Sequence, residues 1–245
     1  MPLYLNNGST SFIEFQSNIP EDYTGTLLPG GKFLYSAKDS FQLIIQEIVT
    51  DLFTIRLNVF KFFKKISIES LSHKSGLHSR ILLQENLRHR IKGAGTIYLR
   101  EGEYTMLWSG DANCKTKFEK DKEYKILDIF YSPGLVQQLT SFFPDLAEVT
   151  NNNQTKLLVK SPSFITPAMQ GIVQQILDCP FDNATRMFYF DLKVREFLFL
   201  MLEHAYKPAR SRYRFTPYET SCIIKAHKLL LEDISKKPLS IQMLA

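Results

Sequence analysis

Apolar and polar residues alternate with a period of two from Ser11 to about Tyr131. In residues 53–59, FTIRLNV, the odd-numbered positions are apolar and the even-numbered positions are polar. Residues 77–91 repeat the pattern, residues 96–108 fit two short strands around a Gly-containing turn, and residues 123–131 fit one more strand. Such alternation is typical of strands with one buried face. Many short strands in succession predict an antiparallel β-barrel or jelly roll.

Helical signals replace this alternation at Ser132. Ser132 precedes Pro133 and Thr166 precedes Pro167, and a hydroxyl cap followed by proline at the first helical position marks a helix start. After each start, apolar residues recur three and four positions apart. The sequence therefore predicts a helical region over residues 132–208 and an α+β fold as a whole.

The longest predicted helix, residues 182–208, is more apolar than one buried stripe requires. Five of its residues follow a three-four alternation close to a heptad seam: Met187, Phe190, Val194, Phe197 and Met201. Two interpretations are open. Either the helix lies between the sheet and a neighbouring helix, or the seam also packs against a second subunit and makes the protein a homodimer.

The end of the chain has the pattern of two helices joined by a tight polar turn. Pro208 ends the long helix, residues 209–216 form a short basic linker, and Thr216 opens a helix that runs to about Ile234. Ser240 then caps a further helix. This is the layout of the front of a helix-turn-helix unit.

The segment IIKAHKLLLEDISKKPLSIQMLA, residues 223–245, resembles the opening of the DNA-binding domain of the AraC/XylS family of bacterial transcription regulators. The matching residues lie in the family's order and spacing: Ala226, Leu230, Ile234, Pro238, Leu239, Ser240, Ile241, Leu244 and Ala245. The resemblance implies a β-rich, cupin-like sensing domain, then helices that commonly mediate dimerisation, then a DNA-binding domain with two helix-turn-helix units.

On this layout we expect residues 1–131 to form the effector-binding domain, residues 132–208 the helical dimerisation region, residues 209–216 a linker, and residues 217–245 an incomplete DNA-binding domain. The recognition helices would follow Ala245, so the chain is expected to end inside the first helix-turn-helix unit. The resemblance implies a sequence-specific DNA-binding regulator in which a small-molecule effector changes how two subunits present their DNA-binding domains.

Charge and cysteine content are compatible with such a regulator. The net charge of +5 and the pI near 9.0 suit a polyanionic partner such as DNA. Cys114, Cys179 and Cys222 are far apart and in no Cys-x-x-Cys spacing, so neither a disulfide framework nor a zinc site is indicated. We expect a cytoplasmic protein without a membrane segment, because no apolar stretch is long enough to cross a bilayer.

A jelly roll is also the architecture of metal-binding cupins, which hold a divalent metal with a His-x-His pair and a nearby Glu. His73, His78 and His89 show no such pair, and no Ser-His-Asp order or phosphate-binding glycine loop stands out. No catalytic residue, metal site or cofactor is therefore predicted. The alternative to a regulator is a stand-alone cupin-like ligand-binding protein or metal-dependent enzyme.

Polar residues that share the parity of apolar neighbours on a strand are candidates for an effector pocket. Glu85 and His89 have this parity, and Trp108 closes a neighbouring strand. We expect these three residues to bind the effector, although Glu85 and His89 could instead satisfy each other near the barrel mouth. Sugars, aromatic acids and siderophores are all open as ligands.

The start of the last predicted helix carries candidate DNA contacts. Lys236 and Lys237 precede Ser240, and ammonium groups beside a helix N-terminus suit a phosphate oxygen. In a full-length protein, these three residues are expected to contact DNA.

Overall fold

The computed structural model of the chain describes residues 3–6, 10–18, 20–21, 23–72, 75–110, 112–151, 155–159, 161–206 and 221–226. The chain divides into two compact units, residues 1–206 and residues 207–245. In the second unit, the described residues 221–226 are helical, within the helix predicted from Thr216 to Ile234. The account below concerns the first unit.

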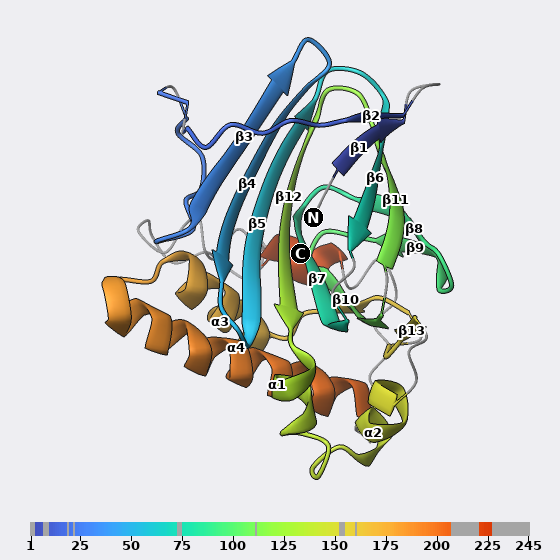
Figure 1. Cartoon of the computed structure of the whole chain (residues 1–245), viewed down its shortest axis with the longest axis vertical. Coiled ribbons are helices and arrows are strands. Elements are labelled where there is room, and N and C mark those ends of the chain that lie inside the picture. The colour runs from blue at the N-terminus through green and yellow to red at the C-terminus, as the bar shows by residue number, and fades with distance from the viewer. Residues whose placement is uncertain are drawn as a thin grey trace. The chain divides into compact units, whose positions relative to one another are not determined.

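Two antiparallel sheets form a sandwich (Figure 1). The smaller sheet has six strands in the order β2 (Thr10–Phe12), β1 (Leu3–Asn6), β6 (Ile66–Ser72), β11 (Ala112–Phe118), β8 (Leu87–Ile91) and β9 (Gly95–Leu99). The larger sheet has eight strands: β13 (Lys156–Leu157), β10 (Glu103–Ser109), β7 (Gly76–Gln84), β12 (Lys122–Tyr131), β5 (Phe53–Phe62), β4 (Phe41–Val49) and β3 (Lys32–Lys38) in order, with β14 (Ser163–Phe164) also paired to β10. From β6 to β12 the chain crosses between the sheets repeatedly.

Among the described residues of the first unit, four helices follow β12: α1 (Pro133–Gln137), α2 (Pro144–Asn151), α3 (Pro167–Leu177) and α4 (Asn183–Tyr206). The predicted caps are confirmed. The side chain of Ser132 accepts a hydrogen bond from the backbone N–H of Leu135, and that of Thr166 accepts one from the N–H of Met169. The predicted α+β fold, an antiparallel jelly-roll sandwich followed by helices, is likewise confirmed.

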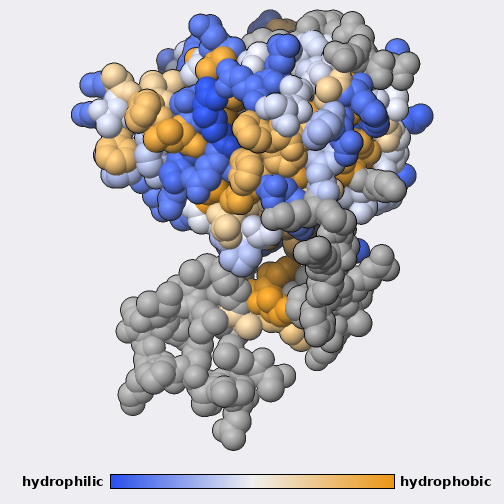
Figure 2. Space-filling model, turned by 90° about the horizontal axis from the view of Figure 1, so that it is seen from below, coloured by the Kyte–Doolittle hydropathy of each residue, from blue (hydrophilic) through white to orange (hydrophobic). Residues whose placement is uncertain are grey.

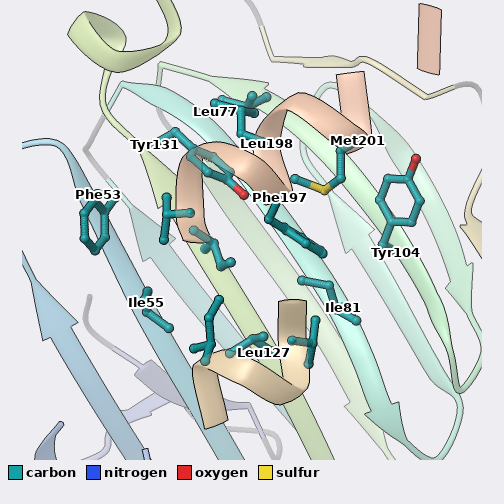
Figure 3. Close-up of a cluster of buried hydrophobic side chains, with 14 of the residues drawn as sticks. Phe53, Ile55, Leu77, Ile81, Tyr104, Leu127, Tyr131, Phe197, Leu198 and Met201 are labelled. Atoms are coloured by element: carbon teal, nitrogen blue, oxygen red, sulfur yellow. The ribbon is translucent and has the colours of Figure 1, made fainter. Parts of the chain in front are cut away.

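Alternate residues of the larger sheet face two separate apolar cores. On one face, β5, β7, β10 and β12 contribute residues that pack against α3 and α4 (Figure 3), among them Ile55, Leu77, Ile81, Tyr104, Leu127 and Tyr131. On the other face, residues of the larger sheet pack against the smaller sheet, among them Phe41, Phe60 and Phe62 with Ile66, Leu87 and Phe118. The second core fills one part of the sandwich interior.

The heptad-like seam of α4 belongs to the first of these cores. Phe190, Val194, Phe197 and Met201 are 0% exposed and pack within the same chain. Figure 3 shows Phe197 and Met201 directed at the larger sheet. This corrects the expectation of a seam between subunits for these four residues, because a contact with a second subunit would have to use residues that α4 leaves exposed. Met187, the fifth residue, is 36% exposed.

One strand prediction needs correction, and a second, the two strands around a Gly-containing turn within residues 96–108, is confirmed. Residues 77–91 form two strands in different sheets, because the chain turns at Glu85, which has a φ of 70°. The strands within residues 96–108 do form, but β9 pairs with β8 in the smaller sheet and β10 pairs with β7 in the larger one. Alternation identified the buried face of each strand but not the sheet to which the strand belongs.

Among the helices that the structure describes, none is both long enough and apolar enough to cross a membrane.

Candidate functional site: a charged cluster between the two sheets

Charged and polar side chains interrupt the apolar interior of the sandwich. They come from inward-facing positions on the central strands of the larger sheet: Arg56 and Asn58 on β5, Arg80 on β7 and Asp128 on β12. Register brings them together, since Arg56 and Arg80 both lie opposite Asp128 on the two neighbouring strands. We call these residues, with Glu47, His89 and Thr116, the interior cluster.

Arg80 and Asp128 form the centre of the interior cluster. Nε of Arg80 donates to Oδ1 of Asp128 at 2.7 Å and Nη2 donates to Oδ2 at 2.9 Å, which is a bidentate ion pair. Nδ2 of Asn58 donates to Oδ2 of the same carboxylate at 3.0 Å. Beside this pair, Nη2 of Arg56 donates to Oε2 of Glu47 at 2.7 Å. The cluster thus contains two ion pairs with matched charges.

Arg80 also connects the larger sheet to the smaller one. Its Nη1 lies 3.3 Å from Nδ1 and 3.4 Å from Nε2 of His89 on β8. Nδ1 of His89 lies 2.8 Å from Oγ1 of Thr116 on β11. Polar contacts therefore cross the interior of the sandwich at this level.

The environment fixes the protonation states at the centre of the cluster. Burial lowers the pKa of His89 to about 3, with the positive charge of Arg80 acting in the same direction, so the imidazole is neutral at physiological pH. Burial alone would raise the pKa of Asp128, but the charge and hydrogen bonds of Arg80, with Arg56, outweigh it and lower that pKa. Burial likewise opposes the charge of Arg80, but Asp128 outweighs it and raises the pKa of the guanidinium.

Solvent reaches these charges although they lie between two sheets. The side chains of Arg80 and Asp128 are each 21% exposed, and those of Arg56 and Glu47 are 19% and 17% exposed. Buried apolar residues lie in the core of Phe41, Phe60 and Phe62, and in a small separate cluster: Ile91, Ile97, Leu107 and Cys114. A few convergent polar groups among apolar residues are typical of small-molecule sites.

The structure separates the three residues expected to bind the effector. His89 lies in the interior cluster and is 5% exposed. Glu85 lies at the β7–β8 turn and accepts a hydrogen bond from Nζ of Lys122 at 2.7 Å, so it does not pair with His89. Trp108 is buried on the helix-facing side of β10, within the core that contains α3 and α4. Of the three, only His89 belongs to the interior cluster, and Glu85 and Trp108 lie elsewhere in the first unit.

Sequence reasoning missed Arg80, Asn58 and Asp128. Arg80 and Asn58 occupy the polar positions of alternating strands, and alternation alone predicts that such positions face solvent. The larger sheet has cores on both faces, so its polar positions point inward. The available signal was Asp128, a carboxylate within the apolar run ILDIF.

Other expectations concern metals and DNA. Within the described residues, no group of three or more His, Cys, Asp or Glu side chains is placed to hold a metal ion. Lys236, Lys237 and Ser240, which were expected to contact DNA, lie outside the described residues, as does the predicted linker of residues 209–216.

Comparison with known families identifies the type of protein. The family model of the regulatory protein PchR N-terminal domain matches residues 52–214, which is more than half of the chain. The chain belongs to this family. PchR is an AraC-type regulator, so the resemblance to AraC/XylS regulators is confirmed at the level of the family. This regulatory domain therefore belongs to a family of transcription regulators.

Several solved structures are similar to this regulatory domain at low identity. The AraC-like transcriptional activator CuxR is 11% identical with a TM-score of 0.47, over 84% of this chain and 69% of that one. The cupin domain of Cnp3 from Schizosaccharomyces pombe is 11% identical with a TM-score of 0.33, over 48% and 80% of the two chains. A cupin superfamily protein from Desulfitobacterium hafniense is 15% identical with a TM-score of 0.32, over 49% and 98%. No curated protein matches the chain.

Proposed function

We propose that the chain is the effector-sensing and dimerisation region of a sequence-specific, DNA-binding transcription regulator, and that a small-molecule effector binds at the interior cluster. The observation that carries this proposal is the Arg80–Asp128 ion pair, which lies between the sheets and is partly exposed to solvent. Family membership supports the regulatory role.

The energetics of the ion pair favour recognition over stability as its role. Removing two charges from water costs several kcal/mol per ion in proteins, and well-packed apolar residues of similar volume are often as stabilising as a buried pair, or more so. Apolar residues already fill neighbouring parts of the sandwich interior. Apolar residues could therefore also fill the space that Arg80 and Asp128 occupy. Retaining charged groups here is explained if they bind a ligand.

The chemistry of the interior cluster indicates the kind of effector. Each guanidinium is paired with a carboxylate, and the imidazole of His89 is neutral. The groups near Arg80 include donors and acceptors of both charged and neutral types. We therefore expect a polar effector of low net charge that both donates and accepts hydrogen bonds.

Dimerisation is proposed for the exposed side of α4. Phe188, Leu192 and Phe199 are 67%, 49% and 45% exposed, with Met187 beside them. Figure 2 views this face and shows hydrophobic residues among hydrophilic ones. Phe188, Leu192, Arg195 and Phe199 follow one another at intervals of four, three and four residues, which is the spacing of a helix–helix contact. The effector would act by preferring one arrangement of two such subunits.

The test uses the full-length regulator and its own promoter in a gel mobility assay. The wild-type complex is expected to change mobility or affinity when a small-molecule extract of the source cells is added. The variant Arg80→Met/Asp128→Leu is expected to bind DNA but to lose this response, because the polar contacts to the effector are gone. Lys65→Gln/Glu119→Gln, which removes an exposed ion pair, is the control and should respond as the wild type does.

Two outcomes would contradict the proposal. A wild-type regulator that no extract affects would argue against effector control. A double variant that responds at the same extract concentration as the wild type would place the effector elsewhere.

A further inference from the structure

The outer face of the smaller sheet carries a basic surface. Its members are the outward-facing residues of β8 and β11 together with the residue that follows β8: Arg88, Arg90, Lys92, Lys115 and Lys117. In the register of these strands, Arg90 lies opposite Lys115 and Arg88 lies opposite Lys117. Directly opposite side chains on neighbouring strands have Cβ atoms about 4.5–5.5 Å apart. Four cationic side chains therefore occupy one compact block.

Little negative charge accompanies the basic surface. Nζ of Lys115 lies 3.0 Å from Oε1 of Glu69 on β6. Within the strands of this sheet that the structure describes, Glu69 is the outward-facing acidic residue. Like charges placed directly opposite each other destabilise a sheet. An arrangement that the fold disfavours is explained if an anionic partner binds it.

An exposed aromatic ring adjoins the block. The guanidinium of Arg88 lies over the ring of Tyr98 on β9, 5.2 Å from the ring centroid, and Tyr98 is 61% exposed. A guanidinium stacked on a ring keeps its N–H edge for hydrogen bonds to oxygen anions. The contact thus positions Arg88 on the sheet surface for a phosphate or carboxylate.

We propose that the basic surface binds the phosphate backbone of duplex DNA without regard to sequence. This inference rests on the proposed function, because DNA is the polyanion that a DNA-binding regulator binds. Arg88, Arg90 and Lys92 are two residues apart and so project from one side of the strand over about 14 Å. Duplex DNA carries about one charge per 1.7 Å of helix axis, so several phosphates fall within this span.

The experiment measures binding of the 245-residue chain to a random-sequence duplex of about 30 base pairs by fluorescence anisotropy, at salt concentrations from about 50 to 200 mM. The dissociation constant of the wild type is expected between about 1 and 100 µM near physiological salt, and affinity should fall steeply as salt rises. Random sequence is used so that the measurement does not depend on base recognition.

The test variant is Arg90→Glu/Lys117→Glu. Neither side chain takes part in the Arg88–Tyr98 or Lys115–Glu69 contact. Each new carboxylate lies opposite a remaining basic side chain, so like-charge pairs become opposite-charge pairs and the sheet should be at least as stable. The control is Lys38→Glu/Lys64→Glu, two exposed positions at the end of β3 and between β5 and β6, with no acidic residue opposite either in the described strand register. Each variant changes the net charge by −4, from +5 to +1.

The test variant is expected to bind at least about tenfold more weakly than the control at the same salt, with the salt slope of log K smaller by about two. Equal affinity of the two variants would overturn the inference, since net charge alone would then explain binding. Binding to labelled poly-glutamate together with no binding to the duplex would also overturn it and point to an acidic protein instead.

Failure of this inference can be told apart from failure of the proposed function. The proposed function fails if the full-length regulator does not respond to an effector, which can occur while binding to random duplex is normal. The inference about the basic surface fails on the comparison of the two variants, whatever the effector response.

Discussion

Arg80 is the side chain on which the polar interior of the sandwich depends. It pairs with Asp128 within the larger sheet and contacts His89 of the smaller sheet. Its partners remain polar when it is removed, so its loss leaves charge and hydrogen-bonding groups partly buried without compensation. Substitutions at this residue and at Asp128 should therefore separate two quantities: the net contribution of the ion pair to folding stability, and the penalty for leaving one of its charges unpaired.

Arg80→Leu is expected to lower the free energy of unfolding by about 3 kcal/mol, because Asp128 would be left without its main partner in a largely enclosed position. Arg80→Leu/Asp128→Leu is expected to lie within about 1 kcal/mol of the wild type, since neither charge remains. Urea unfolding measures both changes, with an unchanged denaturant slope as the check on two-state behaviour. A double variant as unstable as the single one would make the pair a structural requirement and weaken the argument for recognition.

The neutral His89 predicts a loss of stability in mild acid. Its pKa is about 3 in the folded chain, against about 6.5 for an unfolded histidine. Between these values the unfolded state binds more protons, so stability falls with decreasing pH by up to about 1.4 kcal/mol per pH unit. Asp128 acts in the same direction at lower pH: its folded pKa is lowered, so its contribution is present above its unfolded pKa and is lost as pH falls through the folded one.

The variant His89→Gln isolates this effect. Between about pH 6.5 and 4.5, the wild type is expected to lose about 2 kcal/mol more unfolding free energy than His89→Gln does. Both proteins keep Asp128, so its contribution cancels in the comparison. Parallel losses in urea unfolding at the two pH values would mean that His89 is protonated in the folded chain.

At this scale the sequence could predict single residues only in part. His89 was identified from its parity, because β8 has one buried side. Arg80 and Asn58 were missed because β5 and β7 are buried on both sides, so alternation no longer separates core from solvent. Glu85 was misplaced because a positive φ at a turn interrupts the parity on which the assignment depended.

Among the helices and strands, α4 has two sides that differ in their surroundings. One side is core, and the other presents aromatic and aliphatic residues to solvent. Both sides of α4 carry large apolar residues, which explains why the sequence left two interpretations of the helix open. Its start, its length and its apolar seam could be predicted, but the surface that the seam packs against could not.

Substitutions on the buried side of α4 should affect stability, and substitutions on its exposed side should affect self-association. Phe197→Ala is expected to lower the free energy of unfolding by about 3–5 kcal/mol, because it opens a cavity in the core. Phe188→Ser/Leu192→Ser is expected to change unfolding by less than about 0.5 kcal/mol, as exposed positions usually do.

The second variant should instead weaken self-association, measured by sedimentation over a range of concentrations. Phe12→Ser, an exposed aromatic on β2, is the matched control and should leave association unchanged. An unaltered dimer in Phe188→Ser/Leu192→Ser would place the subunit interface away from α4.

A side-chain hydrogen bond links the last turn of α4 to the larger sheet. The hydroxyl of Tyr104 on β10 lies 2.8 Å from Nδ1 of His204. Tyr104→Phe is expected to reduce stability by about 1 kcal/mol and to accelerate amide hydrogen exchange in the last turn of α4, because helix ends open locally when contacts are lost.

Tyr98→Phe is the control for Tyr104→Phe, since Tyr98 is exposed and lies in the other sheet. Exchange that is equally fast in the wild type and in Tyr104→Phe would show that this bond does not hold the helix end. In the proposed regulator, this bond is a direct contact between the sensor sheet and the residues that lead out of the first unit.

For the whole molecule, the sequence predicted the class of fold but not its assembly. Alternation up to Tyr131 and capped helices after it define an antiparallel sandwich followed by helices. They do not specify that β8 and β9 belong to the smaller sheet while β7 and β10 belong to the larger one. That choice depends on pairing between strands far apart in sequence, for which a single strand carries no local signal.

The position of β12 determines when the molecule can fold during its synthesis. β12 lies between β5 and β7 in the larger sheet, although it is the last of the long strands to be made. Until Tyr131 has left the ribosome, β5 and β7 have no strand between them, and both expose unpaired edges. Synthesis at about 5–20 residues per second leaves these edges unprotected for several seconds. Exposed strand edges can pair with other chains, and here they are exposed while Asp128, and with it the interior cluster, is not yet in place.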